Sequence, residues 1–458
     1  MIATICLSLF MVGGDDPKTK EQSLAELQHS YAMNHFEPAS HMALAKFHHD
    51  RGNRLLAFYI LETARRTRFE AKDFDAAFDK SFRGVKPFDN SKETEKKLLA
   101  KHQQEPKDAE TLFGLADIYI SREDWKIAKA FLTKLIAVKP EVYENYAALA
   151  EVYRREKDDK KAAEIVASFF TKYPDSVEGF ERKIAPLMRK DPEKAKPVLE
   201  QALKKHPKHA TFVFNQAVLL QNADKLKEAE ETFVKAAELG KDNAHIQGWV
   251  GRFFLRARKN EGKSLPYYLN VYFLDPHFYD TEFAEGRIRK LNFNAASAIV
   301  EKAEKDGKKM AGLLEHENPV VVSLALGKLA KPWVATKRPY FLAALAHDDP
   351  TIRMQATGIL MKNGDDSFNK EIQALLGSSD LRKRGVACYL AVNLWKEKGV
   401  DAVRPMLAEK SQLVRFDAIS ALWREGGETG KKAVRDHAKN EKHPWLSKMI
   451  KSFDEKSP

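Results

Sequence analysis

The chain has 458 residues, of which 43% are hydrophobic, and this composition excludes a wholly disordered protein. Lys and Arg outnumber Asp and Glu by 77 − 65 = 12, but the excess is spread along the chain, so it favours solvated helix faces over a nucleic-acid footprint. Two cysteines cannot build a disulfide framework, which excludes the small disulfide-stapled classes of protein.

The amino-terminal end carries the longest apolar run, MIATICLSLFMV. It is too short for a membrane span, which takes about 20 residues, and no span is expected. The run has the length of a signal-peptide core, and the two glycines that follow suit cleavage, although no basic segment precedes it. Residues 1–14 are therefore a candidate signal peptide, and export to the periplasm or outside the cell is slightly favoured. The alternative is an ordinary apolar start of a cytoplasmic chain.

A period of 34 residues dominates the next part of the chain. Each unit has small and large apolar residues on two successive helical faces, followed by a proline. The first clear unit carries Leu112, Leu115, Ala116, Tyr119, Ala128, Leu132, Leu135 and Pro140, and the next carries Tyr146, Leu149, Ala150, Tyr153, Ala162, Val166, Phe169 and Pro174. Small residues recur where two helices cross closely, and the proline ends the second helix. The pattern predicts stacked helical hairpins.

These hairpins resemble the tetratricopeptide repeat family, whose period is about 34 residues. The resemblance covers about residues 39–276 and is strongest over residues 108–174. Pro186 and Pro197 depart from the pattern, because each removes a backbone hydrogen bond inside an expected helix and should kink or shorten it. The resemblance implies a right-handed superhelix over residues 15–276, whose inner surface holds another protein.

The period then changes to 31 residues, in four recurring columns. They are Leu314, Leu345, Leu376 and Leu407; Asn318, Asp349, Asp380 and Ser411; Val322, Arg353, Arg384 and Arg415; and Ala325, Ala356, Ala387 and Ala418. The second column contains only good N-cap residues, whose side-chain oxygen can accept a bond from the first free amides of a helix. The alanine column predicts a close helix crossing in each unit.

An N-cap, then Pro, then Arg and Ala at fixed spacing resembles the HEAT repeat in a short form. This resemblance covers about residues 291–451 and implies a HEAT-like array over residues 277–458. The expected fold class is therefore all-α: an α-α superhelix or solenoid in which tetratricopeptide-like hairpins are followed by HEAT-like hairpins.

Catalytic signatures are absent from the sequence, which has no phosphate-binding loop, dinucleotide fingerprint, nucleophile elbow or zinc-protease motif. We expect no enzymatic activity, no cofactor and no metal site. His41 and His48 lie seven residues apart on one helical face, but residues four apart suit a shared metal ion better. Core packing is the favoured interpretation of both histidines.

Five residues are the best candidates for a binding surface. Arg353, Arg384 and Arg415 align along one face of a stacked array, where they predict a ladder of Arg–Asp hydrogen bonds between repeats. The alternative is a basic stripe that binds an acidic peptide or phosphates. Tyr119 and Tyr153 lie on first helices of their hairpins, where the inner surface forms.

The expected function is that of a non-catalytic scaffold or adaptor, which holds an extended peptide or a helix of another protein in the concave face of the solenoid. The alternative is a basic solenoid that binds nucleic acid through its net positive charge. HEAT-like arrays also occur in enzymes, but that possibility rests on fold analogy alone.

Overall fold

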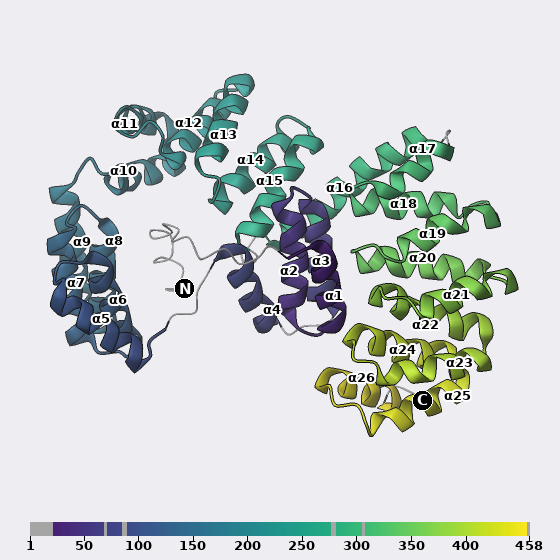
Figure 1. The fold of residues 1–458 in the computed structure, drawn as a ribbon. Coiled ribbons are helices and arrows are strands. Elements are labelled where there is room, and N and C mark those ends of the chain that lie inside the picture. Colours follow the sequence, from purple (N-terminus) through teal and green to yellow (C-terminus); the bar gives the residue numbers. More distant parts are fainter. Residues whose placement is uncertain (1–21, 68–70, 85–88, 276–280, 305–306, 456–458) are drawn as a thin grey trace. The chain divides into compact units, whose positions relative to one another are not determined.

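The computed structural model describes residues 22–67, 71–84, 89–275, 281–304 and 307–455 (Figure 1). Every regular element in these ranges is a helix, and the helices pack as adjacent hairpins, which confirms the expected all-α solenoid class. Among the described helices, none combines the length and the apolar character that a membrane span requires. The candidate signal peptide, residues 1–14, lies outside the described residues.

The chain forms two compact units that are not consecutive in sequence. Residues 86–250 make the first unit, and residues 18–85 together with residues 251–458 make the second. The sequence predicts a different kind of boundary, between tetratricopeptide-like repeats in residues 15–276 and HEAT-like repeats in residues 277–458. That boundary stays a prediction. Helix α14, Ala244–Arg256, crosses from one unit to the other.

The first unit consists of helices of 13 or 14 residues that pair along the chain. They are α5 (Lys92–Gln104), α6 (Ala109–Ser121), α7 (Trp125–Val138), α8 (Tyr143–Arg155), α9 (Asp159–Lys172), α10 (Val177–Lys190), α11 (Pro192–Lys205), α12 (Ala210–Asn222) and α13 (Leu226–Leu239). Pro186 and Pro197 do not shorten α10 and α11, which keep 14 residues each, and both prolines are exposed to solvent. The expectation of shorter helices at these prolines is therefore wrong.

The second unit begins with an amino-terminal group of helices and continues, after α14, with the carboxy-terminal array. Its elements are α1 (Leu24–Met33), α2 (Pro38–Asp50), α3 (Arg54–Thr67), α4 (Ala71–Phe78), η1 (Asp79–Arg83), α15 (Glu261–Leu274), α16 (Thr281–Ala303), α17 (Gly307–Gly312), η2 (Leu313–Glu315), α18 (Pro319–Leu329), η3 (Ala335–Lys337), α19 (Arg338–Ala344), α20 (Pro350–Asn363), η4 (Asp366–Phe368), α21 (Asn369–Leu376), α22 (Leu381–Trp395), α23 (Glu397–Val403), η5 (Arg404–Ala408), α24 (Gln412–Glu425), α25 (Gly427–Ala438) and α26 (Pro444–Glu455).

The predicted N-cap column is confirmed in all four repeats. The side chains of Asn318, Asp349, Asp380 and Ser411 accept hydrogen bonds from backbone amides at the start of α18, α20, α22 and α24. The alanines of the fourth column are fully buried, as the predicted close crossings require. Short polar caps and small crossing residues thus set the register of the array.

The amino-terminal helices pack against one layer of this array. Figure 1 shows α18, α20, α22 and α24 in the layer that faces α1–α3, and α19, α21, α23 and α25 in the layer that faces away. Helix α1 contacts α22 and α24, while α3 contacts α15, α18 and α20. Leu27, Tyr31 and Ala32 of α1 share one buried cluster with Leu381 and Val414 of the array. The face that an isolated solenoid would offer to a partner is thus largely covered by the chain's own helices.

Candidate functional site

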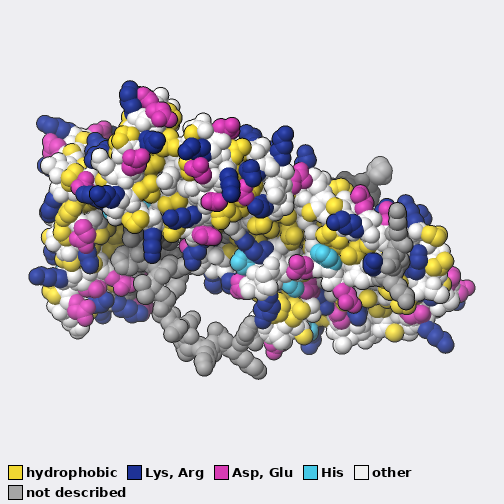
Figure 2. All heavy atoms as spheres, turned by 90° about the horizontal axis from the view of Figure 1, so that it is seen from above, with side chains coloured by type: hydrophobic (Ala, Val, Ile, Leu, Met, Phe, Trp, Pro, Cys, Tyr) yellow, Lys and Arg dark blue, Asp and Glu magenta, His cyan; other side chains and the backbone are white. Residues whose placement is uncertain are grey.

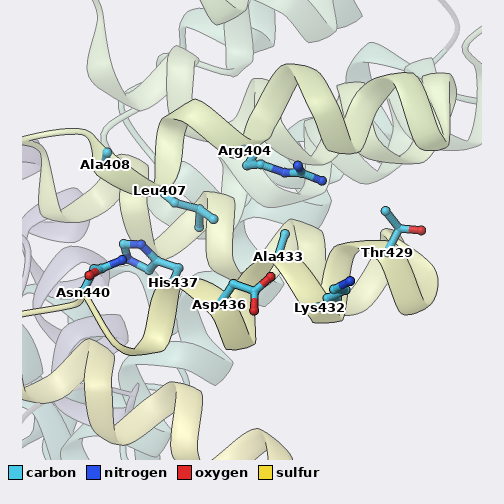
Figure 3. A pocket seen from close by; sticks show the side chains of 9 residues that line it. All are labelled: Arg404, Leu407, Ala408, Thr429, Lys432, Ala433, Asp436, His437 and Asn440. Carbon is cyan, nitrogen blue, oxygen red and sulfur yellow. The ribbon is translucent and has the colours of Figure 1, made fainter.

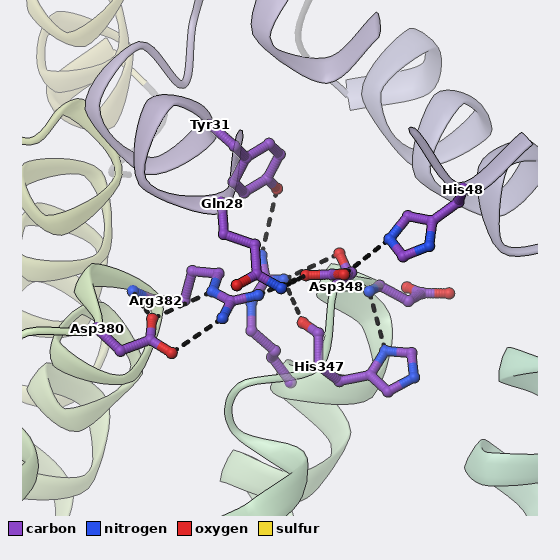
Figure 4. Close-up of polar contacts among 9 residues, drawn as sticks. Gln28, Tyr31, His48, His347, Asp348, Asp380 and Arg382 are labelled. Atoms are coloured by element: carbon purple, nitrogen blue, oxygen red, sulfur yellow. Dashed lines mark hydrogen bonds and ion pairs between the residues drawn. The ribbon is translucent and has the colours of Figure 1, made fainter. Parts of the chain in front are cut away.

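A buried polar cluster joins α1 and α2 to the array, with Asp348 at its centre (Figure 4). One carboxylate oxygen of Asp348 accepts from Arg382 Nη1 at 2.5 Å and from Gln28 Nε2 at 2.8 Å, and the other oxygen lies 2.8 Å from His48 Nε2. Burial by itself raises the pKa of Asp348, but the hydrogen bond from His48 and the charge of Arg382 outweigh it and hold the pKa below its ordinary value. Asp348 is therefore a charged hub that ties three segments together.

The predicted arginine ladder exists as a repeated contact, but its acceptors differ from the expected aspartates. Arg353 donates to the carbonyl of the residue six positions earlier, His347, at 2.6 Å, and Arg384 and Arg415 repeat this bond at 2.9 and 2.7 Å. Each arginine thereby fixes its own helix to the preceding loop. Side chains of a helix lean toward its amino-terminal end, and each of these arginines lies in the first turn of its helix. Its guanidinium group therefore reaches the carbonyls of the loop that precedes the N-cap residue.

The second bond of each arginine reaches another segment. Arg384 donates to the Glu409 carboxylate at 2.7 Å, and Arg415 donates to that of Glu441 at 3.0 Å, in both cases in the following repeat. Arg353 instead donates to the hydroxyl of Tyr31, from α1, at 3.2 Å. Whether any of these arginines also contacts a partner stays a prediction.

A further column of contacts was missed by the sequence analysis. Two residues before the cap, His316, His347 and Ser378 each accept a hydrogen bond from the backbone amide of the cap residue, at 3.0, 2.9 and 3.2 Å. In the last repeat Glu441 accepts in the same way from His443 at 2.8 Å. Histidine occupies this position in two of the repeats, at His316 and His347, and the 31-residue spacing of these two histidines was the signal that could have found the contact. Ser378 holds the equivalent position in the next repeat, so the column does not keep one residue type.

His347 makes the stability of the second unit depend on pH. Its Nδ1 accepts from the amide of Asp349, so this nitrogen carries no proton in the folded chain. Burial lowers the pKa of His347; the charges of Asp349 and Asp348 oppose this shift, and those of Arg353 and His48 add to it. Because the folded pKa lies below the unfolded value, the unfolded chain binds the proton first, and stability falls as the pH drops through about 6.5.

We expect the free energy of unfolding of the second unit to fall, for this group, by up to about 1.4 kcal/mol per pH unit as the pH drops below about 6.5. His347→Ser is the matched variant, because a serine already serves the next repeat at this position, where Ser378 accepts from Asp380. Its stability should vary less with pH in urea unfolding over the same range. An equal pH dependence in the variant and the wild type would contradict the assignment.

The two candidate tyrosines lie in the first unit, on α6 and α8, and both are half-buried. Tyr119 donates from its hydroxyl to Glu95 at 2.6 Å, and this hydrogen bond, together with burial, raises the pKa of Tyr119 to about 12. The ammonium of Lys129 lies 4.9 Å from the centre of the Tyr153 ring. Both side chains have contacts within the unit, and a contact of either with a partner stays a prediction.

A pocket remains open where α3 meets the array, and we call it the α3–α18 pocket. It has a volume of about 340 Å³, and four helices of the second unit line it. The lining residues are Tyr59, Glu62, Thr63, Arg289, Phe293, Pro319, Val320, Ser323, Leu324, Asp349, Thr351 and Ile352. The side chain of Phe293 is 54% exposed, the largest such value among the described large hydrophobic side chains. This volume lies within the range of ligand pockets in proteins.

A second cavity of about 500 Å³ lies between η5 and α25, on the layer that faces away from α1–α3 (Figure 3). Arg404, Lys432, Asp436 and His437 contribute to its lining. His437 is hydrogen-bonded to Glu441 at 3.1 Å, and Arg404 lies 3.5 Å from Asp401. Mixed charges of this kind select no particular class of ligand.

Several side chains with possible chemistry have local contacts. His41 is buried and bonds through Nε2 to the carbonyl of His35 at 2.9 Å, and burial raises the pKa of the Cys388 thiol well above its ordinary range. Within the described ranges, no three His, Cys, Asp or Glu side chains come together as a metal site would require. Figure 2 shows Lys and Arg interspersed with Asp and Glu on the face that it presents.

Comparison with known proteins supports part of the repeat assignment. Residues 187–252 match the family model described as tetratricopeptide repeat. No curated protein sequence matches the chain. The matched stretch runs from the end of α10 into α14, so it falls on the predicted tetratricopeptide-like hairpins.

Three solved structures are similar at low scores. They are the Naa15/Naa10 complex bound to HypK-THB (15% identity over 94% of this chain and 74% of that chain, TM-score 0.26), the TPR domain of P58(IPK) (14% over 76% and 94%, TM-score 0.25) and a monomeric mutant of IFIT1 with m7Gppp-AAAA (13% over 79% and 94%, TM-score 0.26). TM-scores this low do not establish a shared arrangement of the repeats. The family match supports a tetratricopeptide repeat protein, and the hairpins of the first unit are the part of the chain that carries it.

Proposed function

We propose that the chain is a non-catalytic protein-binding scaffold, and that a protein partner docks in the α3–α18 pocket. The observation that supports this most is the apolar opening beside α3, where Phe293 of α16 is exposed. A half-exposed phenylalanine beside a preformed pocket is typical of an interface anchor. The tetratricopeptide match at residues 187–252 supports the same class of function.

We further propose that the 31-residue repeats of the second unit are HEAT-like and that residues 277–458 hold them. The filled N-cap column and the buried alanine column support this assignment. Arg384 and Arg415 would then hold successive repeats together, because each also donates to a glutamate of the following repeat. Arg353 would instead hold α20 to α1 through its bond to Tyr31. On this proposal, the partner contacts residues of the α3–α18 pocket and not these three arginines.

The test is an affinity pull-down with the full chain from lysate of its source cells, with and without nuclease, analysed by mass spectrometry. We expect a protein partner that is recovered in stoichiometric amount and survives nuclease treatment. An unrelated bait with a similar net charge of +12 is the control for nonspecific adsorption. Recovery dominated by nucleic acid, with all proteins lost after nuclease, would contradict the proposal and favour the nucleic-acid-binding alternative.

A further inference from the structure

We infer that the α3–α18 pocket binds a peptide segment in which an apolar side chain is followed closely by an acidic one. This inference rests on the proposed function and specifies the chemistry of the partner. The apolar side chain would fill the pocket beside Phe293, and the carboxylate would face the arginines at its rim. The inference combines three features of the site: its lining, its volume and the exposure of its charges.

The floor of the pocket is apolar and belongs to three helices of the array. Phe293 comes from α16, Val320 and Leu324 come from α18, and Ile352 comes from α20. Tyr59 of α3 closes the opposite side, where its hydroxyl accepts a bond from Asn292 at 3.1 Å. A volume of about 340 Å³ is enough for a large side chain and its neighbours but not for a whole helix. The pocket therefore suits one anchor residue of an extended or helical segment.

Four charged side chains from α3 and α16 form a chain that begins in the pocket lining, with Glu62 and Arg289, and continues outside it with Glu285 and Arg65. Arg65 lies 2.7 Å from Glu285, Arg289 lies 3.5 Å from the same carboxylate, and Arg289 also pairs with Glu62. The chain is neutral in sum, but its members are unequally accessible. The exposed fractions of the side chains are 31% for Arg65 and 32% for Arg289, against 13% for Glu285 and 5% for Glu62. A partner that approaches this rim meets the guanidinium groups first.

The remaining acidic group of the pocket is turned away from a partner. Asp349 is buried, and its carboxylate accepts from the amide of Thr351 at 2.7 Å as the cap of α20. Arg289 and Phe293 are four residues apart on α16, so they lie on one helix face, one turn from each other. An apolar anchor on Phe293 would therefore place its flanking carboxylate within reach of Arg289 and Arg65. Arginine at a partly desolvated rim binds carboxylates well.

The experiment uses the full chain and a displayed library of random dodecapeptides. Peptides that survive selection are synthesised with a fluorescent label, and their Kd is measured by fluorescence anisotropy. We expect them to share a large apolar residue with Asp or Glu within about four positions, which is one helical turn. Phe293→Ala should weaken their binding by about tenfold or more, as loss of an interface anchor does. Arg65→Gln should weaken binding by severalfold and reduce its dependence on salt.

Met354→Ala is the matched control. Met354 is 41% exposed, on helix α20 of the same array, and it does not line the pocket. This variant should bind the selected peptides as the wild type does, and circular dichroism should show that all three variants are folded. Selected peptides that lack acidic residues, or that bind Phe293→Ala as tightly as the wild type, would overturn the inference.

The inference and the proposed function can fail separately. If the pull-down yields a nuclease-resistant protein that binds Phe293→Ala as tightly as the wild type, the scaffold function survives, but docking in the α3–α18 pocket and this inference are both overturned. If no peptide is selected and a single-stranded RNA oligonucleotide binds instead, both are overturned. A selected acidic-apolar peptide that competes with the captured protein supports both.

Discussion

Asp348→Ala is expected to lower the free energy of unfolding of the second unit by about 3 kcal/mol. The substitution removes the acceptor of Arg382, which is buried, and it also leaves Gln28 and His48 without their bonds to this carboxylate. Breaking a buried ion pair by removing one partner costs about 3–5 kcal/mol. The lower end applies here because Asp380 still accepts from Arg382 at 2.9 Å.

The measurement is urea unfolding followed by tryptophan fluorescence. Four of the chain's six tryptophans, Trp333, Trp395, Trp423 and Trp445, lie in the second unit. Asp401→Ala is the control, because Asp401 forms an exposed pair with Arg404 and such pairs contribute about 0–1 kcal/mol. Equal losses in the two variants would show that Asp348 is not the buried hub described here.

Tyr31→Ala is expected to destabilise the second unit by about 3–5 kcal/mol, as truncation of a buried aromatic side chain does. Tyr31 is fully buried on α1, with its ring 4.9 Å from that of His35 and 4.7 Å from that of His41. Its hydroxyl also accepts from Arg353, which loses this partner in the variant. Because α1 contacts α22 and α24, the loss should spread to the array.

Amide hydrogen exchange identifies the helices that lose stability in this variant. In Tyr31→Ala, we expect the amides of α20, α22 and α24 to exchange faster together with those of α1. Tyr31→Phe should lose only the bond to the arginine, about 1.5–3 kcal/mol. Tyr340→Ala, at a side chain that is 40% exposed, should change stability by less than about 0.5 kcal/mol. Faster exchange confined to α1 would mean that the amino-terminal helices are a loose appendage of the array.

The sequence alone was sufficient wherever a local rule decides the structure. The caps at Asn318 and Asp349 were predicted because a short polar side chain before a helix has one favourable partner, the nearby free amide. The crossing at Ala356 was predicted because only a small residue allows two helices to approach closely. Both depend on neighbours within a few residues, or on a repeat that brings equivalent positions together.

The long-range packing could not be predicted from the same patterns. The hydrogen bond from Gln28 to Asp348 joins residues that are 320 positions apart, and no period of the sequence relates them. Ala57 and Leu61 lie within residues 39–276, which the tetratricopeptide resemblance covers, yet they pack in the second unit with Leu291 of the array. An apolar face on a hairpin predicts that this face is buried, but it does not predict which other helix packs against it.

The candidate site was missed for a related reason. Phe293 reads in the sequence as one more apolar residue of a helix, and only the positions of α3 and α18 leave its ring exposed at a pocket. Arg65 and Arg289 read as ordinary surface charges, although they share Glu285. The three arginines recur every 31 residues, and this spacing made them candidates for a binding surface. A residue that recurs in every repeat can equally make a structural contact that each repeat requires.

The most direct test of the proposed scaffold function is site-specific photocrosslinking in the native cell. A benzophenone amino acid is placed at position 293 in one strain and at position 354 in another, and crosslinked peptides are identified by mass spectrometry. We predict that position 293 yields a crosslink to a single protein, within a segment that combines apolar and acidic residues, and that position 354 does not. Equal crosslinking at both positions, or none at position 293, would contradict a partner site in the α3–α18 pocket.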